Sequence, residues 1–181
     1  MRVPQYTPQT IAAIDMHLTE QCMKFAPADF DHYKAVSTHE AAHIVAGLAC
    51  DAAILEVEIN SPRTTKHALG GVNVSGLLAH HDAIICLAGW AWEEAHGDTR
   101  GAANDWRAGK ECDSKNLDRN LDAARQLVRD AEPVIKACAA AVMGHLNRRG
   151  KMSSRNLEKV LTQIRPHARR HALHLAHNGN A

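Results

Sequence analysis

Two histidines and a glutamate stand at a spacing that could hold a metal ion and activate water. They are His39, Glu40 and His43, in an alanine-rich stretch that favours helix. Residues four apart lie on one face of a helix, about 5–6 Å apart at Cβ, so both imidazoles can reach one zinc ion. Glu40 would project beside the metal and could take a proton from zinc-bound water. This is the chemistry of peptide-bond hydrolysis.

The motif is short, and the chain holds 13 histidines, so the alternative is a helix with two surface histidines and a solvated glutamate. Catalytic zinc takes three protein ligands and keeps one position open. A third histidine six residues after His43 would extend the motif, but Ala49 occupies that position. Carboxylates occur downstream at Glu93-Glu94 and at Asp105, and the motif alone leaves the choice between them open.

The hydrophobic pattern predicts the elements that would position these residues. Apolar residues recur every three or four positions over 8–24, 27–50, 80–96 and 102–115, which indicates amphipathic helices. The second of these helices carries the motif, and its expected apolar face consists of Val36, Ile44, Val45 and Leu48.

A hairpin is expected between the second and third helices. Leu55, Val57 and Ile59 alternate with glutamates, which indicates a half-buried strand, and 69–75 offers a second short strand. An exposed strand beside a zinc-binding helix could pair with the extended backbone of a substrate. A hairpin that only caps the helical core is an equally good interpretation.

A long helix follows, and its apolar stripe predicts core packing, with a dimeric coiled coil as the lesser alternative. The stripe consists of Leu121, Ala124, Val128, Ala131, Ile135, Cys138 and Val142. Pro133 predicts a kink or a restart within this helix, and Gly150 is expected to end it. A last helix is expected over 156–164, capped by Ser153 or Ser154.

The chain is long enough for one domain with a real core, and we expect that domain to span 1–164, with an arm and a helix over 1–27. Residues 165–181 read as a basic tail in which His167, His171, His174 and His177 recur. We interpret it as a frayed C-terminus; a second metal site or an anionic partner are alternatives.

Charge and composition restrict the possible partners and the compartment. A net charge of +1 makes no case for nucleic acid or a membrane surface. The five scattered cysteines indicate reduced thiols, and no signal peptide or membrane-spanning run is evident, so we expect a cytoplasmic protein. Gly144 and Gly150-Lys151-Met152 only approximate a phosphate loop, so no nucleotide site is expected. A homo-oligomer is possible.

Four segments, in the same order, resemble segments of FtsH-type zinc peptidases. Residues 38–43 are similar to a stretch around the family's H-E-A-G-H, and 68–70 (Ala-Leu-Gly) match the A-L-G after its first strand. Residues 87–94 resemble its L-G-G-R-A-A-E-E, and 101–105 resemble its G-A-x-N-D, whose aspartate is the third zinc ligand. The resemblance spans roughly 36–107.

This resemblance implies a mainly α (α+β) fold, a helical zincin-like peptidase domain with a small β-hairpin. It also implies Asp105 as the third ligand, ahead of Glu93 and Glu94. Ala42 replaces a family glycine, and Trp90 and Trp92 replace Arg and Ala. We expect neither the ATPase module nor the membrane anchor of the family. We therefore expect a stand-alone domain limited to unfolded or flexible polypeptides, unless a separate unfoldase or adaptor delivers them.

The resulting hypothesis is a zinc metalloendopeptidase in which His39, His43 and Asp105 hold Zn²⁺ and Glu40 activates the zinc-bound water. Glu93, Glu94 and Asn104 are candidates for orienting the ligands, although solvated surface positions are as good an interpretation for each. The rival hypothesis is a non-catalytic peptide- or protein-binding module that keeps the peptidase fold. A structural zinc is the weakest alternative, because such sites are usually closed by four ligands rich in cysteine.

Overall fold

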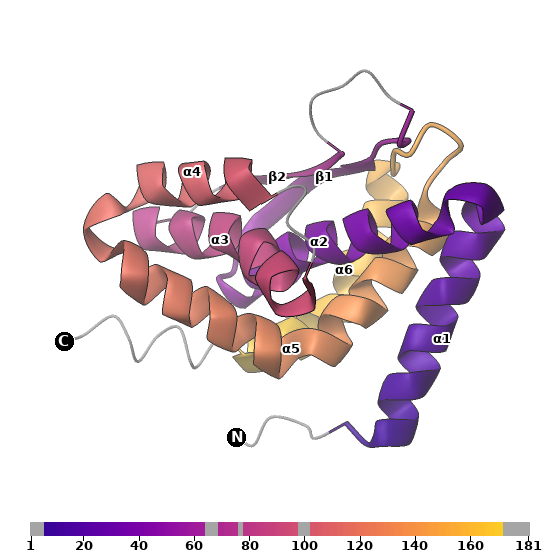
Figure 1. The fold of residues 1–181 in the computed structure, drawn as a ribbon, viewed down its shortest axis with the longest axis horizontal. Helices are drawn as coiled ribbons and strands as arrows, with labels where there is room; N and C mark the ends of the chain where they lie inside the picture. Colours follow the sequence, from indigo (N-terminus) through magenta and orange to yellow (C-terminus); the bar gives the residue numbers. More distant parts are fainter. Residues whose placement is uncertain (1–5, 64–68, 76–77, 98–101, 172–181) are drawn as a thin grey trace.

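The computed structural model describes residues 6–63, 69–75, 78–97 and 102–171. This part of the chain is mainly helical with one small sheet, as predicted (Figure 1). The elements are α1 (Pro8–Phe25), α2 (Phe30–Ala49), β1 (Ala53–Ile59), β2 (Gly70–Ser75), α3 (Ala79–His96), α4 (Ala102–Cys112), α5 (Leu117–His145) and α6 (Ser154–Ala168), with short 3₁₀ turns at Pro27–Asp29, Ser114–Asn116 and Arg169–His171.

Helix α2 is the central element of the fold. It packs against α1, α3, α5, α6 and both strands, and every residue from 36 to 49 is buried. The expected apolar face, with Ile44 and Leu48, is confirmed, but burial extends around the whole helix. Small residues allow this, because Ala41, Ala42 and Gly47 let neighbouring elements approach the α2 backbone. The histidine motif is therefore set in the core, so the alternative of two surface histidines is wrong.

The predicted hairpin is present, but its first strand does not follow a simple alternation. Strands β1 and β2 pair antiparallel, with Ile54 opposite Val74 and Glu56 opposite Asn73. Leu55 is the extra residue in this bulge, and its side chain is 54% exposed while Ile54 and Val57 are buried. The expectation that Leu55 faces the core is wrong, because a bulge shifts the inward side of the strand by one residue.

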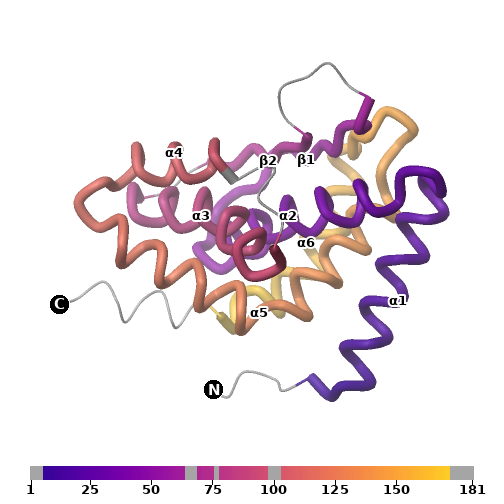
Figure 2. Tube along the Cα trace, viewed as in Figure 1, coloured from indigo at the N-terminus to yellow at the C-terminus, as the bar shows by residue number. Residues whose placement is uncertain are grey.

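Helices α3 and α4 follow the hairpin in the chain and lie side by side (Figure 2). Helix α3 ends at Gly97, which adopts a left-handed conformation with φ of 74° and caps the helix through a bond to the Glu93 carbonyl. Helix α4 ends at Cys112, three residues before the predicted end, and a 3₁₀ turn leads into α5. Helix α4 packs mainly against α3.

Helix α5 runs through Pro133 without a restart, so the expectation of a restart there is wrong. The apolar stripe packs into the core as predicted, and Ala131, Val134 and Ile135 are buried on both sides of the proline. This packing holds the two halves of the helix in one element although Pro133 cannot donate a backbone hydrogen bond. Helix α5 ends at His145, earlier than expected, and Gly150 lies in the turn that follows.

Ser153 precedes α6 and caps it, because its side chain accepts a hydrogen bond from the Asn156 amide, as one of the two predicted caps. The helix continues to Ala168, beyond the predicted end of the domain at 164. Residues 165–171 are helical, and Ala168 and His171 are buried, so the folded structure extends to His171 and the expectation of a frayed end from 165 is wrong for this segment. His174 and His177 lie outside the described residues.

Candidate metal centre

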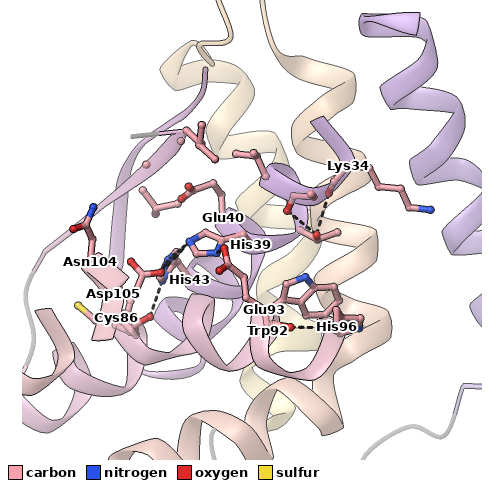
Figure 3. A pocket seen from close by; sticks show the side chains of 18 of the residues that line it. Lys34, His39, Glu40, His43, Cys86, Trp92, Glu93, His96, Asn104 and Asp105 are labelled. Atoms are coloured by element: carbon pink, nitrogen blue, oxygen red, sulfur yellow. Dashed lines mark hydrogen bonds and ion pairs between the residues drawn. The ribbon is translucent and has the colours of Figure 1, made fainter. Parts of the chain in front are cut away.

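The two histidines of the motif come from consecutive turns of α2 and point the same way, toward the first turn of α4 (Figure 3). Their Nε2 atoms lie 3.1 Å apart, and their rings meet edge to face with centroids 4.9 Å apart. His39 and His43 are 8% and 9% exposed. Because α2 is surrounded by other elements, neither imidazole can turn toward bulk solvent without disturbing the core.

Asp105 completes a triangle of atoms that could bind a metal ion. Its Oδ2 lies 3.0 Å from His39 Nε2 and 3.5 Å from His43 Nε2. A tetrahedral ion with bonds of about 2.0–2.1 Å places neighbouring ligand atoms about 3.3–3.4 Å apart, which is close to all three separations. The structure thus brings the third predicted ligand to the two histidines.

The donor set fits a divalent cation with nitrogen and oxygen ligands. Asp105 Oδ2 is buried without a well-formed hydrogen bond to any described residue, although two imidazole nitrogens face it. A carboxylate oxygen that faces two ring nitrogens needs either a shared proton or a cation between them. Two imidazoles and one carboxylate are a common ligand set for catalytic zinc, which leaves a fourth position open.

The far side of each imidazole is held by its own partner. His39 Nδ1 lies 2.8 Å from Oε1 of the buried Glu93, and His43 Nδ1 donates to the Ile85 carbonyl at 2.7 Å. The bond to the Ile85 carbonyl places the proton of His43 on Nδ1 and leaves its Nε2 with a lone pair for a metal. The carboxylate of Glu93 favours the same arrangement in His39, although this close contact lacks the geometry of a well-formed hydrogen bond. Glu93 and Ile85 both lie on α3, so one helix orients both histidines of the other.

The other two candidates for orienting the ligands do not reach the histidines. Glu94 points to a different side of α3 and forms a two-pronged ion pair with Arg125, at 2.7 Å for both bonds. Asn104 is exposed at the edge of the cavity, and Figure 3 shows its side chain directed away from His39 and His43. Of the three candidates, Glu93 alone has the position that the prediction requires.

Glu40 lies beside the histidines and beneath the start of β2. The side chain is 4% exposed, and one of its oxygens lies within 4.8 Å of the histidine nitrogens. A Cβ placed on Gly70 would come within 2.5 Å of Glu40 Oε1, so a side chain at this position would displace the carboxylate. Glycine at the first position of β2 therefore leaves room for the Glu40 carboxylate.

For His39 and Asp105, burial and the neighbouring charged groups shift the pKa in opposite directions. Burial by itself lowers the pKa of His39, but the carboxylates of Asp105 and Glu93 outweigh it and raise the value to about 10. Burial would raise the pKa of Asp105, yet the two imidazoles hold it well below its usual range. Burial raises the pKa of Glu40. Without a metal, the cluster therefore retains a proton that a cation would displace.

The centre opens into a cavity of about 870 Å³ that reaches far beyond the three ligands. Strand β2 forms one wall, from Gly70 to Val74. The opposite end is lined by Trp92 and His96 of α3 and by Lys34 of α2. A cavity of this size can accommodate several residues of an extended chain, whereas one water and one small ion would need far less room.

Two glycines of the site were not identified as functional from the sequence. A Cβ on Gly89 would clash with His43 Nε2 and lie 2.7 Å from His39 Cε1, so α3 can approach the imidazoles only with glycine there. Gly70 has the same role beside Glu40. Both lie within segments that carry the FtsH-type resemblance, which was the available signal.

Comparisons with sequence models of protein families, with curated proteins and with solved structures found no match for this chain. The helices in the described part of the chain are too short or too polar to cross a membrane.

Proposed function

We propose that the chain is a zinc-dependent metallopeptidase that cuts unfolded or flexible polypeptides. The observation that carries the proposal is the triangle of His39 Nε2, His43 Nε2 and Asp105 Oδ2, with sides of 3.0 to 3.5 Å, next to a buried glutamate. The four residues together supply what hydrolysis needs, namely three ligands, one open position and one free base. The resemblance of four segments to FtsH-type zinc peptidases also supports the proposal.

When bound, zinc would supply the positive charge that polarises a peptide carbonyl and makes a water molecule acidic. Glu40 has the position of the general base. It takes a proton from the attacking water and passes it to the amine that leaves. Its raised pKa suits both steps, because a carboxyl group with a pKa nearer to neutral both accepts and releases a proton readily.

Strand β2 has the position expected of a substrate-binding edge. One of its sides pairs with β1, and within the described residues no other strand pairs with it. Residues 70–74 line the cavity beside Glu40. An extended peptide that paired with this edge would run past the metal centre. Pairing through the backbone requires an unfolded segment, which supports flexible chains as the substrate class.

The five cysteines are free and mostly buried, which suits a reducing compartment, so the proposal places the protein in the cytoplasm. A separate unfoldase or adaptor that delivers substrates also belongs to the proposal.

The rival function is a binding module that holds a polypeptide in the cavity without cutting it. Retention of a buried glutamate that costs stability favours the peptidase, because a binding module gains nothing from it.

Glu40→Gln separates the two functions. Zinc-loaded protein is incubated with fluorescently labelled casein, and zinc content is measured by elemental analysis. We expect the variant to keep its zinc and to lose about a hundredfold to ten-thousandfold in turnover. Glu158→Gln, an exposed glutamate of α6, is the matched control and should cut at the wild-type rate. Equal cleavage by wild type and Glu40→Gln would remove Glu40 from the mechanism, and zinc without any cleavage would favour the binding module.

A further inference from the structure

Helix α4 carries Asp105 but contributes little to the core. From residue 103 to residue 112, Gly109 is the one buried residue. It contacts Leu87 of α3 so closely that a Cβ on Gly109 would lie 2.6 Å from Leu87 Cγ. A helix of 11 residues is too short to be stable alone. The position of Asp105 therefore depends on how α4 packs against α3, the helix with which α4 makes most of its contacts.

Trp106, the residue after Asp105, makes an aromatic contact with α3. Its ring centroid lies 5.2 Å from that of Trp90 on α3, with the two planes at 48°. Both rings are partly buried against the core. Such tilted aromatic pairs attract each other beyond the area that they bury. The pair joins the first turn of α4 to the middle of α3.

A third helix supports this pair from the other side. The guanidinium carbon of Arg125, on α5, lies 5.3 Å from the centroid of the Trp90 ring, within the range of a cation–π contact. Glu94 holds the same guanidinium through two bonds of 2.7 Å. We name Trp90, Glu94, Trp106 and Arg125 the tryptophan clasp. It connects α3, α4 and α5 at one point.

The clasp and the metal centre use two neighbouring stripes of α3. Ile85, Gly89 and Glu93, each four residues apart, contact the histidines of α2. Trp90 and Glu94, each one residue further along, belong to the clasp. Because both stripes are on one rigid helix, α3 sets the distance between the imidazoles and the first turn of α4.

We infer that the tryptophan clasp positions Asp105 over the two histidines and thereby sets the affinity of the centre for zinc. Trp106 is a positioning residue, because it acts through Asp105 and does not touch the centre itself. This inference rests on the proposed function only in its assumption that the centre binds zinc. Trp90 and the clasp are features of this chain, since the FtsH-type pattern has Arg in place of Trp90.

A double-mutant cycle on zinc affinity tests the inference. Affinity is measured by competition with a chromophoric chelator for wild type, Trp106→Ala, Asp105→Ala and the double variant. We expect Trp106→Ala to lower the affinity about tenfold to a hundredfold, the range for residues that orient metal ligands. In the Asp105→Ala background, Trp106→Ala should have little further effect, because the ligand that it positions is already absent. Trp106→Phe keeps an aromatic ring and should recover most of the affinity.

Phe25→Ala is the matched control, because Phe25 forms an aromatic pair with Tyr33 at 4.9 Å that involves neither α3 nor α4. It should leave zinc affinity within about twofold. Equal losses from Trp106→Ala with and without Asp105 would show a general packing role and overturn the inference. Zinc that binds to neither wild type nor variants would overturn the inference and the proposed function together. Coupled losses without peptide cleavage would overturn the proposed function alone.

Discussion

The two sides of the metal centre are built in different ways. On one side, α2 holds His39 and His43 in the middle of the core, with every residue from 36 to 49 buried. On the other side, α4 holds Asp105 on an outer helix in which only Gly109 is buried between residues 103 and 112. Two ligands therefore lie on the buried central helix, whereas the third lies on an outer helix that contacts the rest of the fold mainly through α3.

This difference predicts which changes damage the fold and which damage only the site. The imidazoles are oriented by Glu93 and the Ile85 carbonyl, both parts of a helix that packs on α2. Asp105 lies beside Trp106, which packs on Trp90 of α3, and the inference above assigns its position to this pair. Substitutions on the α2 side should change stability and metal affinity together, and substitutions on the α4 side should change affinity with a smaller change in stability.

Removal of a ligand from each side gives the largest expected effect. His43→Ala and Asp105→Ala should each weaken zinc binding by roughly a hundredfold or more, since ligands of a zinc site share a binding free energy of about 10–16 kcal/mol. His43→Ala should also lower the unfolding temperature of the metal-free protein more than Asp105→Ala, because it leaves a buried void. Elemental analysis and thermal unfolding measure the two quantities. Equal losses of stability would contradict the proposed difference between the two sides.

A second comparison adds one methyl group to each side. Gly89→Ala places a Cβ against His43 and His39, which cannot move because they are buried, and should cost roughly 1–3 kcal/mol of unfolding free energy as well as zinc affinity. Gly109→Ala meets Leu87, but α4 can shift outward, and alanine favours helix by about 1 kcal/mol, so the net change should be small. Urea unfolding measures both. A larger loss for Gly109→Ala would show that α4 is held as firmly as α2.

The pH dependence of zinc affinity depends on carboxylates from both sides. Burial lowers the pKa of His39, but Asp105 and Glu93 raise it to about 10, so the metal-free imidazole stays protonated up to that pH. Zinc must displace this proton, so affinity should rise with pH from 7 to 9, by up to about tenfold per unit. In Glu93→Gln the pKa of His39 falls, and the rise should end at lower pH. Chelator competition at several pH values measures this, and a wild-type affinity that stays constant above pH 7 would rule it out.

The smallest expected effect comes from Asn104→Ala. This side chain is exposed and points away from the histidines, although it adjoins Asp105 in the sequence. The substitution should change zinc affinity by less than about twofold, as usual for surface positions. Glu93→Gln, by contrast, should lower the affinity about tenfold, because it alters the partner of His39 Nδ1. The same titration measures zinc affinity for both variants. An equal loss for Asn104→Ala would show that Asn104 contributes to zinc binding and would contradict this prediction.

Local patterns predicted the helices well where one pattern continued over several turns. The stripe from Leu121 to Val142 is buried as expected. The pattern misled at Leu55, because a bulge inserts one residue without any mark in the hydrophobic alternation. The last helix extends beyond its predicted end at 164. Ala168 and His171 continue the buried spacing of Leu161 and Ile164, although the residues around them are basic.

By itself, the sequence determined that His39 and His43 share a face of one helix, since a helical period of 3.6 residues brings positions four apart together. It could not decide between Glu93 and Glu94, or between these and Asp105, from the residues alone. Adjacent residues on a helix point about 100° apart, so the packing of α3 on α2 selects Glu93 and turns Glu94 to Arg125. The distance from Asp105 to the imidazoles is likewise a property of how α4 packs on α3, which no local pattern contains.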